Sequence, residues 1–158
     1  MSLLEAFNAL EHSSLLITMR SSPWLFPVIA TVHLFGLSVL GGAALVLDLR
    51  LLGFGLTNQT PAELARQTNV LLIAGAVIML STGVFLFMCF ATKYYYLEAF
   101  WVKIAAVCCV LVLSIFVRSR LQSSEGESLV MKWRIPLGSA FLSLWLIIAL
   151  GGRLIGFP

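Results

Sequence analysis

Apolar residues dominate the chain in four long runs that are separated by short polar stretches. The runs cover residues 24–47, 70–90, 99–117 and 137–150, and each is near the roughly 20 residues with which an α-helix crosses about 30 Å of hydrocarbon. The pattern therefore predicts an all-α fold, an integral membrane four-helix bundle. Because hairpin-like connections leave no room for a soluble domain, we expect residues 1–158 to form a single transmembrane domain.

Two shorter segments carry their own local signals. Residues 2–19 have apolar positions at helical spacing but are too polar and too short to span a membrane. They predict an amphipathic helix that lies in the outer interface before Pro23 and Trp24 turn the chain inward. In the first polar connection, Thr60 precedes Pro61, so we expect Thr60 to cap a short helix that begins at Pro61.

The composition supports a lipid environment and excludes several functions. Of 158 residues, 60% are hydrophobic and 11% are charged, whereas a soluble domain is roughly a quarter charged. The lipid bilayer is thus the first expected partner. The net charge of +3 comes from residues flanking the runs, and no basic stripe interleaved with aromatics predicts nucleic-acid binding. The sequence shows no hydrolase constellation and no nucleotide-binding loop.

The positive charges near the ends of the runs predict an orientation, because Lys and Arg concentrate on the cytoplasmic side. Six lie at the first and third connections, and four lie on the opposite side. This excess predicts a multi-pass protein with both termini in a periplasm-like space. The six are Arg50, Arg66, Arg118, Arg120, Lys132 and Arg134, and the four are Arg20, Lys93, Lys103 and Arg153.

His33 is the most informative residue of the first run. It lies about 14 Å below Trp24 by helix rise, near the middle of the bilayer. Ionisable side chains at such a depth usually face the interior of the bundle. Gly36 and Gly41 lie on or beside the His33 face of the helix, so another helix or a flat cofactor can approach its backbone closely.

The other runs contribute polar or soft side chains to the same predicted interior. Helical spacing puts Met79 on the side of Thr82 and aligns Lys103 with Ser114. On the fourth run, Ser139, Ser143 and Arg153 share a face. The sequence therefore predicts a polar interior with two cations, Lys103 and Arg153, toward the outer side.

One interpretation of this interior is a haem site. His33 would be an axial ligand of b-type haem, with Lys103 and Arg153 pairing with the propionates. The sixth ligand would be His12, His33 of a second copy, or Met79. This interpretation predicts a small redox subunit that is not itself a stand-alone enzyme. The subunit would form a homo-oligomer or bind another membrane or periplasmic redox protein. It would pass electrons to that partner or to quinone.

Two other interpretations remain open. His33 can hydrogen-bond Thr82 or a serine and fix the packing of the helices, as part of a non-enzymatic scaffold. Alternatively, the polar interior passes protons or small solutes. For Lys103 and Arg153, the alternative to binding a ligand is that both side chains simply extend to the interface. We expect Asp48 to pair with Arg50 or to cap its helix at the cytoplasmic end, with a role as proton donor as the alternative.

Several motifs spread over most of the chain resemble an uncharacterised family of small bacterial four-helix inner-membrane proteins. They are WLFP at 24–27, HLFG at 33–36, DLRLLG at 48–53, TGVFLF at 82–87 and GRLIGF at 152–157. The resemblance implies a bacterial inner-membrane location and no established activity. It directs attention to His33, Asp48, Arg50, Thr82, Lys103 and Arg153.

A looser likeness connects the chain to membrane bundles of the cytochrome b and copper-resistance types. Those proteins place several histidines within short helical bundles, and the multiple intramembrane histidines are missing here. Copper transport is therefore disfavoured, although Met79 and Met88 are soft ligands of the kind that copper binds.

Overall fold

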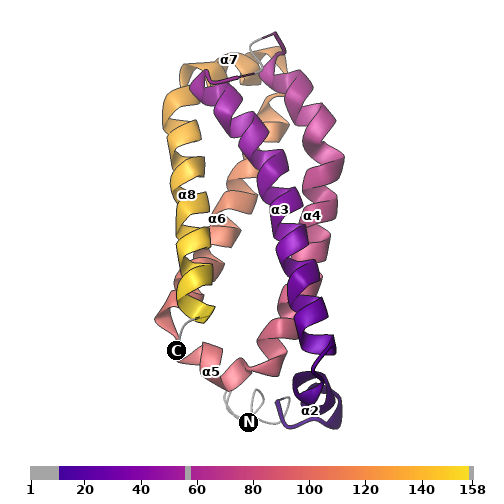
Figure 1. Ribbon diagram of the computed structural model, residues 1–158. Helices are drawn as coiled ribbons and strands as arrows, with labels where there is room; N and C mark the ends of the chain where they lie inside the picture. Colours follow the sequence, from indigo (N-terminus) through magenta and orange to yellow (C-terminus); the bar gives the residue numbers. More distant parts are fainter. Residues whose placement is uncertain (1–10, 56–57, 157–158) are drawn as a thin grey trace. The chain divides into compact units, whose positions relative to one another are not determined.

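The computed structural model describes residues 11–55 and 58–156, and within these ranges the chain is helical with no strand (Figure 1). This confirms the all-α prediction. In chain order the helices are α2 (Ser14–Ser21), α3 (Leu25–Leu52), α4 (Pro61–Cys89), α5 (Ala91–Tyr95), α6 (Glu98–Arg120), α7 (Ser124–Lys132) and α8 (Arg134–Gly156).

Four of these helices, α3, α4, α6 and α8, are long and apolar enough to cross a membrane. They confirm the four predicted spans and indicate a multi-pass membrane protein. Each helix is longer than the apolar run from which it was predicted, and the largest extension at a single end is that of α4, which begins at Pro61 and not near Val70. The reason is that a helix continues into polar sequence as long as its backbone bonds are satisfied, whereas the apolar run marks only the part suited to hydrocarbon.

The start of α4 shows how the polar extension is stabilised. Thr60 Oγ1 accepts a hydrogen bond from the backbone N–H of Glu63 at 3.2 Å, and Glu63 Oε2 accepts from the backbone N–H of Thr60 at 2.9 Å. This reciprocal pair is a capping box, which satisfies two donors that a helix leaves open at its first turn. The predicted cap at Thr60 is confirmed, but the helix that it begins is the 29-residue α4 and not a short one.

The chain divides into two compact units, which we describe separately. Unit 1 comprises residues 1–40 and 73–98, and unit 2 comprises residues 41–72 and 99–158. The helices α3 and α4 each contribute to both units. The single transmembrane domain remains a prediction.

In unit 1, α3 and α4 approach each other at glycines. A Cβ atom added to Gly75 would lie 2.5 Å from the backbone nitrogen of Leu40, and one added to Gly36 would lie 2.7 Å from Cγ2 of Ile78. At Gly75 the three atoms nearest to the added Cβ all belong to the backbone of α3, so no side chain separates the two helices there. The small residues beside His33 thus let a neighbouring helix approach closely, as the sequence predicts.

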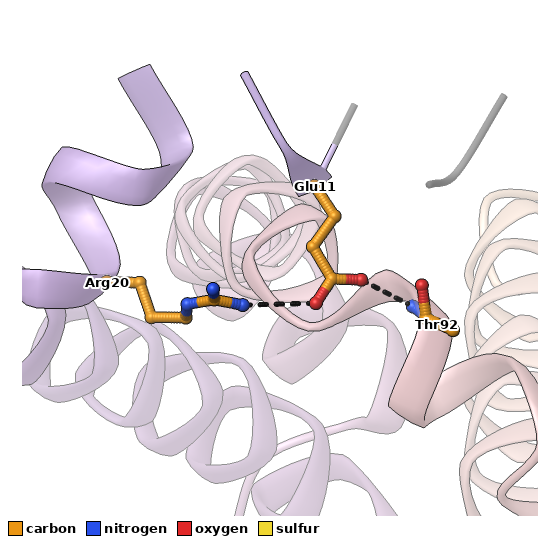
Figure 2. Close-up of polar contacts among 3 residues, drawn as sticks. All are labelled: Glu11, Arg20 and Thr92. Atoms are coloured by element: carbon orange, nitrogen blue, oxygen red, sulfur yellow. Dashed lines mark hydrogen bonds and ion pairs between the residues drawn. The ribbon is translucent and has the colours of Figure 1, made fainter. Parts of the chain in front are cut away.

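A second contact in unit 1 connects the start of the described chain to α5. Figure 2 shows Glu11 between Arg20 and Thr92: its Oε1 pairs with Nη1 of Arg20 at 3.1 Å, and its Oε2 accepts from the backbone N–H of Thr92 at 3.1 Å. Hydrogen bonding by Thr92, together with the Arg20 charge, lowers the pKa of the Glu11 carboxyl below its usual value, although burial opposes this. A short helix, α2, follows this contact and covers residues 14–19 of the predicted interfacial helix 2–19, whereas residues 2–10 of that prediction lie outside the described residues.

In unit 2, α6 and α8 run side by side in opposite directions, and α7 connects them (Figure 1). Ser123 caps α7 by accepting from the backbone N–H of Gly126 at 3.2 Å. The most deeply buried side chains of this unit come from α3, α6 and α8. They are Leu51, Val110, Val117, Phe141 and Ile148.

Candidate functional site

His33 lies half-buried on α3 in unit 1, where its Nδ1 is 3.0 Å from Oγ1 of Thr82 on α4. The hydroxyl of Thr82 donates its own proton to the carbonyl of Ile78 at 2.6 Å, so its oxygen is left to accept. We therefore assign Nδ1–H of His33 as the donor, which puts the lone pair of the ring on Nε2. The predicted hydrogen bond between His33 and Thr82 is confirmed.

The backbone of α4 also holds the imidazole ring in place. A Cβ atom added to Gly83 would lie 3.1 Å from Cε1 of His33 and 3.5 Å from its Nδ1. Any larger residue at position 83 would push against the ring. Glycine at 83 and threonine at 82 thus define both the position and the protonated nitrogen of His33.

The residues predicted to surround His33 occupy different places. Gly36 and Met79 are buried where α3 meets α4 in unit 1, and a Cβ atom on Gly36 would lie 2.9 Å from the backbone nitrogen of Met79. Gly41 belongs to unit 2, where a Cβ atom added to it would lie 3.6 Å from the ring of Trp145. A methionine ligand and a flat cofactor at these positions remain predictions.

A second cluster of polar side chains lies inside unit 2, around Asp48 of α3 and Arg118 of α6. Asp48 is 1% exposed and Arg118 is 8% exposed. Nη1 of Arg118 donates to the carbonyl of Ala65 at 2.5 Å, and Nη2 donates to Oγ1 of Thr68 at 3.1 Å and to the carbonyl of Ala43 at 3.4 Å. The guanidinium thereby joins the backbones of α3 and α4.

The cluster does not use all of its own hydrogen-bonding capacity. Oδ2 of Asp48, Nε of Arg118 and Nε1 of Trp145 are buried without a hydrogen-bond partner. Arg118 and Trp145 both lie near enough to act on the charge of Asp48, but neither reaches it in hydrogen-bond geometry. A buried polar atom left without a partner costs about 1–3 kcal/mol. A proton on Asp48 or a further hydrogen-bond partner would therefore stabilise this cluster.

The predicted ion pair between Asp48 and Arg50 is wrong. Among the residues that the structure describes, these two form no ion pair, and Nε of Arg50 donates instead to the carbonyl of Gln59 at 2.8 Å. Two residues that are two positions apart in an α-helix project about 160° from each other around the helix axis, so Asp48 and Arg50 cannot meet. Arg50 connects the end of α3 to the segment before α4.

The predicted inward face of α8 is also wrong. Ser143 is exposed, and its hydroxyl donates to the carbonyl of Ser139 at 2.8 Å, while Arg153 is exposed near the end of the helix. Because a serine can satisfy its hydroxyl on its own helix, it needs no partner in the interior. The buried positions of α8 are Gly138, Phe141, Ile148 and Gly151.

Lys103 is half-buried on α6, and its alignment with the buried Ser114 agrees with the sequence analysis. The aliphatic part of the Lys103 side chain packs on α8 in unit 2. A Cβ atom added to Gly151 would lie 3.2 Å from Cβ of Lys103, and one added to Gly152 would lie 3.8 Å from its Nζ. Lys103 and Arg153 belong to unit 2, whereas His33 belongs to unit 1. The pairing of both cations with haem propionates remains a prediction.

A family model, described as a family of unknown function (DUF6644), matches residues 25–158. The chain belongs to this family. No curated protein and no solved structure matches the chain. The DUF6644 match begins at the first residue of α3 and contains the four long helices, His33 and the cluster around Asp48. It confirms the resemblance to an uncharacterised family and shows no likeness to cytochrome b.

In this DUF6644 protein, Arg118 is the functional candidate that the sequence analysis misses. It was counted with the charges of the third connection, but α6 continues to Arg120 and buries Arg118. The spacing held a signal: Val107, Ser114 and Arg118 recur at intervals of seven and four, which is one face of a helix. The signal was hidden because a charge next to the end of an apolar run normally extends to the interface.

Proposed function

We propose that this DUF6644 protein is a small redox subunit of the bacterial inner membrane that binds b-type haem through Nε2 of His33. The assignment of the ring proton of His33 to Nδ1 carries the proposal. Histidines that bind metals generally donate their other N–H to a neighbouring group, which fixes the ring and makes the ligand atom more basic. Thr82 accepts that hydrogen bond here, and a neutral imidazole with its lone pair on Nε2 is the form that an iron requires.

The second axial ligand would come from a second copy of the chain. The sequence has two histidines, and His12 is exposed and precedes α2, which leaves His33 as the one within the four long helices. A two-fold homo-oligomer supplies an identical imidazole, since such an interface brings the same patch of both copies together. Met79 on α4 is the alternative ligand. Bound haem would supply one-electron chemistry toward a partner redox protein or quinone, with both termini on the periplasmic side.

The test is the visible spectrum of protein produced with ample haem supply and purified in detergent. We expect a Soret band that His33→Ala removes and His12→Ala leaves intact. Thr82→Val should keep the band but change the reduction potential, because it removes the hydrogen bond that sets the basicity of the ligand. Wild-type protein without a Soret band, or a band that is undiminished in His33→Ala, would overturn the proposal.

A second candidate function, proton passage, is favoured by the buried carboxyl of Asp48. Ionisable groups within membrane-spanning helices commonly mark proton or solute pathways. The unpartnered Oδ2 of Asp48 near Arg118 is an acceptor of this kind. In vesicles that contain the protein and a trapped pH-sensitive dye, we expect a proton flux that Asp48→Asn abolishes and that Glu125→Gln, at an exposed position on α7, does not change. Equal flux with and without the protein would eliminate this candidate.

A further inference from the structure

A cleft of about 550 Å³ lies in unit 2, where the beginning of α4 meets the end of α6. Its volume is within the range of roughly 300–1,000 Å³ that is typical of small-molecule sites. The polar side chains in its wall are Glu63, Arg66, Asn69, Arg118 and Gln122. None of these residues belongs to the proposed haem site around His33.

The position of the cleft along the two helices places it at the boundary of the hydrocarbon. Its residues on α4 lie between Ala62 and Asn69, directly before the apolar run that starts at Val70. Its residues on α6 and beyond start at Arg118, directly after the run that ends at Val117. Polar side chains next to an apolar span lie at the level of the lipid headgroups. The cleft therefore faces the layer that holds the phosphates of the bilayer.

The chemistry of the cleft suits an anion that accepts several hydrogen bonds. Arg118 is held in place by Ala65 and Thr68, and its Nε–H is buried without a partner. Arg66 adds an exposed guanidinium, and the amides of Asn69 and Gln122 add further donors. Guanidinium groups match the geometry of phosphate oxygens, and an arginine already fixed by other contacts loses little freedom on binding.

Two acidic groups oppose these positive charges. The Glu63 carboxylate lines the cleft, but its Oε2 already accepts hydrogen bonds from the backbone N–H and the hydroxyl of Thr60. Asp48 acts on Arg118 from within the unit without forming an ion pair. The exposed guanidinium of Arg66 thus remains available to a ligand, and Arg118 adds its positive charge to the wall of the cleft.

We propose that this cleft binds a phosphate group, and that the headgroup of an anionic membrane phospholipid supplies it. Arg66 and Arg118 pair with the phosphate oxygens, and Asn69 and Gln122 donate from their side-chain amides. Basic pockets between membrane helices bind anionic headgroups in this way. A free phosphate ion offers the same oxygens, so the experiment must separate the two sources.

The test uses the full chain in detergent and measures the binding of phosphatidylglycerol by native mass spectrometry. Diacylglycerol, which lacks the phosphate, and inorganic phosphate, which lacks the lipid, are the comparison probes. We expect phosphatidylglycerol to bind and Arg66→Gln to weaken this binding by about tenfold, the effect of one charge-assisted hydrogen bond. Arg120→Gln, an exposed arginine two residues beyond Arg118 and outside the cleft wall, is the matched control and should leave binding unchanged.

Each outcome decides whether the cleft binds phosphate and whether a lipid supplies that phosphate. Binding of inorganic phosphate that matches phosphatidylglycerol and depends equally on Arg66 would keep the phosphate site but overturn its lipid source. Equal binding of diacylglycerol, or equal losses in Arg66→Gln and Arg120→Gln, would overturn the site itself. Arg118→Lys keeps the charge and loses the planar fork, so it should also weaken binding. If this variant fails to fold, the test still rests on Arg66, whose exposed side chain can be changed without disturbing the packing of α4 on α6.

Discussion

At the scale of single residues, this protein shows how one hydroxyl sets the chemistry of one imidazole. Thr82 gives its proton to the carbonyl of Ile78 and therefore accepts from Nδ1 of His33. The contact fixes the ring as a packing element, and in a neutral imidazole it puts the lone pair on Nε2. The scaffold interpretation and the haem interpretation of His33 thus start from the same hydrogen bond.

Replacing Thr82 tests how much that hydrogen bond contributes to the fold. Thr82→Val keeps the shape and removes the acceptor, so it leaves Nδ1–H of His33 partly buried and unsatisfied. We expect it to reduce the free energy of unfolding by about 1–3 kcal/mol, the cost of an unpaired polar group. Thr82→Ser should lose much less. Thermal unfolding in detergent measures both, and equal melting temperatures for the two variants would contradict the assigned role.

His33→Gln distinguishes the scaffold from the redox subunit. A glutamine amide donates one hydrogen bond, as the imidazole does, but it offers no nitrogen lone pair to iron. A scaffold therefore predicts near wild-type stability and near wild-type function for His33→Gln. The redox proposal predicts a folded variant without a Soret band. Melting temperature and visible spectrum, measured on one preparation, separate the two.

The Glu11 contact predicts a dependence of stability on pH. Because the pKa of Glu11 is lower in the folded state, its ionised form stabilises the fold above the unfolded value of about 4.3. That contribution is lost as the pH falls through the folded value. We expect the melting temperature of the wild type to exceed that of Glu11→Gln at pH 7 and the difference to shrink as the pH falls below about 4.3. A difference that stays constant over this fall in pH would contradict the role of the charge.

At the scale of the helices, the contact of α3 with α4 depends on glycine. A Cβ atom on Gly75 would lie 2.5 Å from the backbone of Leu40, which cannot move aside as a flexible side chain would. We expect Gly75→Ala to destabilise the protein by about 1–3 kcal/mol through overpacking. Gly42→Ala is the matched control, since a Cβ atom there has nothing within 4 Å. Thermal unfolding of the two variants checks this, and equal stability would show that the helices can separate without cost.

At the scale of the whole molecule, the structure refines the charge count that predicts its orientation. Arg118 is buried within α6 and Lys103 is half-buried in the same helix, so neither is a simple loop charge. Removing Arg118 from the six leaves five on one side, and removing Lys103 from the four leaves three on the other. The excess therefore persists, and with it the prediction that both termini are periplasmic.

Cysteine labelling tests that orientation. Ser124→Cys places a thiol at the start of α7, on the side predicted to be cytoplasmic, in a background in which the three native cysteines are replaced. We expect a membrane-impermeant maleimide to label this thiol only after the cells are opened. Labelling of intact cells would show that the chain is inserted in the opposite direction.

The sequence by itself determined the number of spans and several local contacts. Lipid offers no partner to the backbone, so a long apolar run in a multi-pass protein must be a helix, and α3, α4, α6 and α8 could be read directly. The cap at Thr60 depends only on neighbouring residues. The His33 and Thr82 pair was also accessible, because polar groups deep within apolar runs have few partners available.

Only the tertiary structure decided which face of each helix is buried. In water, a buried face is apolar and an exposed face is polar, but the lipid-facing side of a membrane helix is as apolar as the packed side, so hydrophobicity does not distinguish them. For this reason Ser143 and Arg153 were placed on the wrong face of α8. The sequence predicts a loop position for Arg118 because its hydrogen-bond partners, Ala43, Ala65 and Thr68, come from helices that are distant in sequence and meet it only in the folded chain.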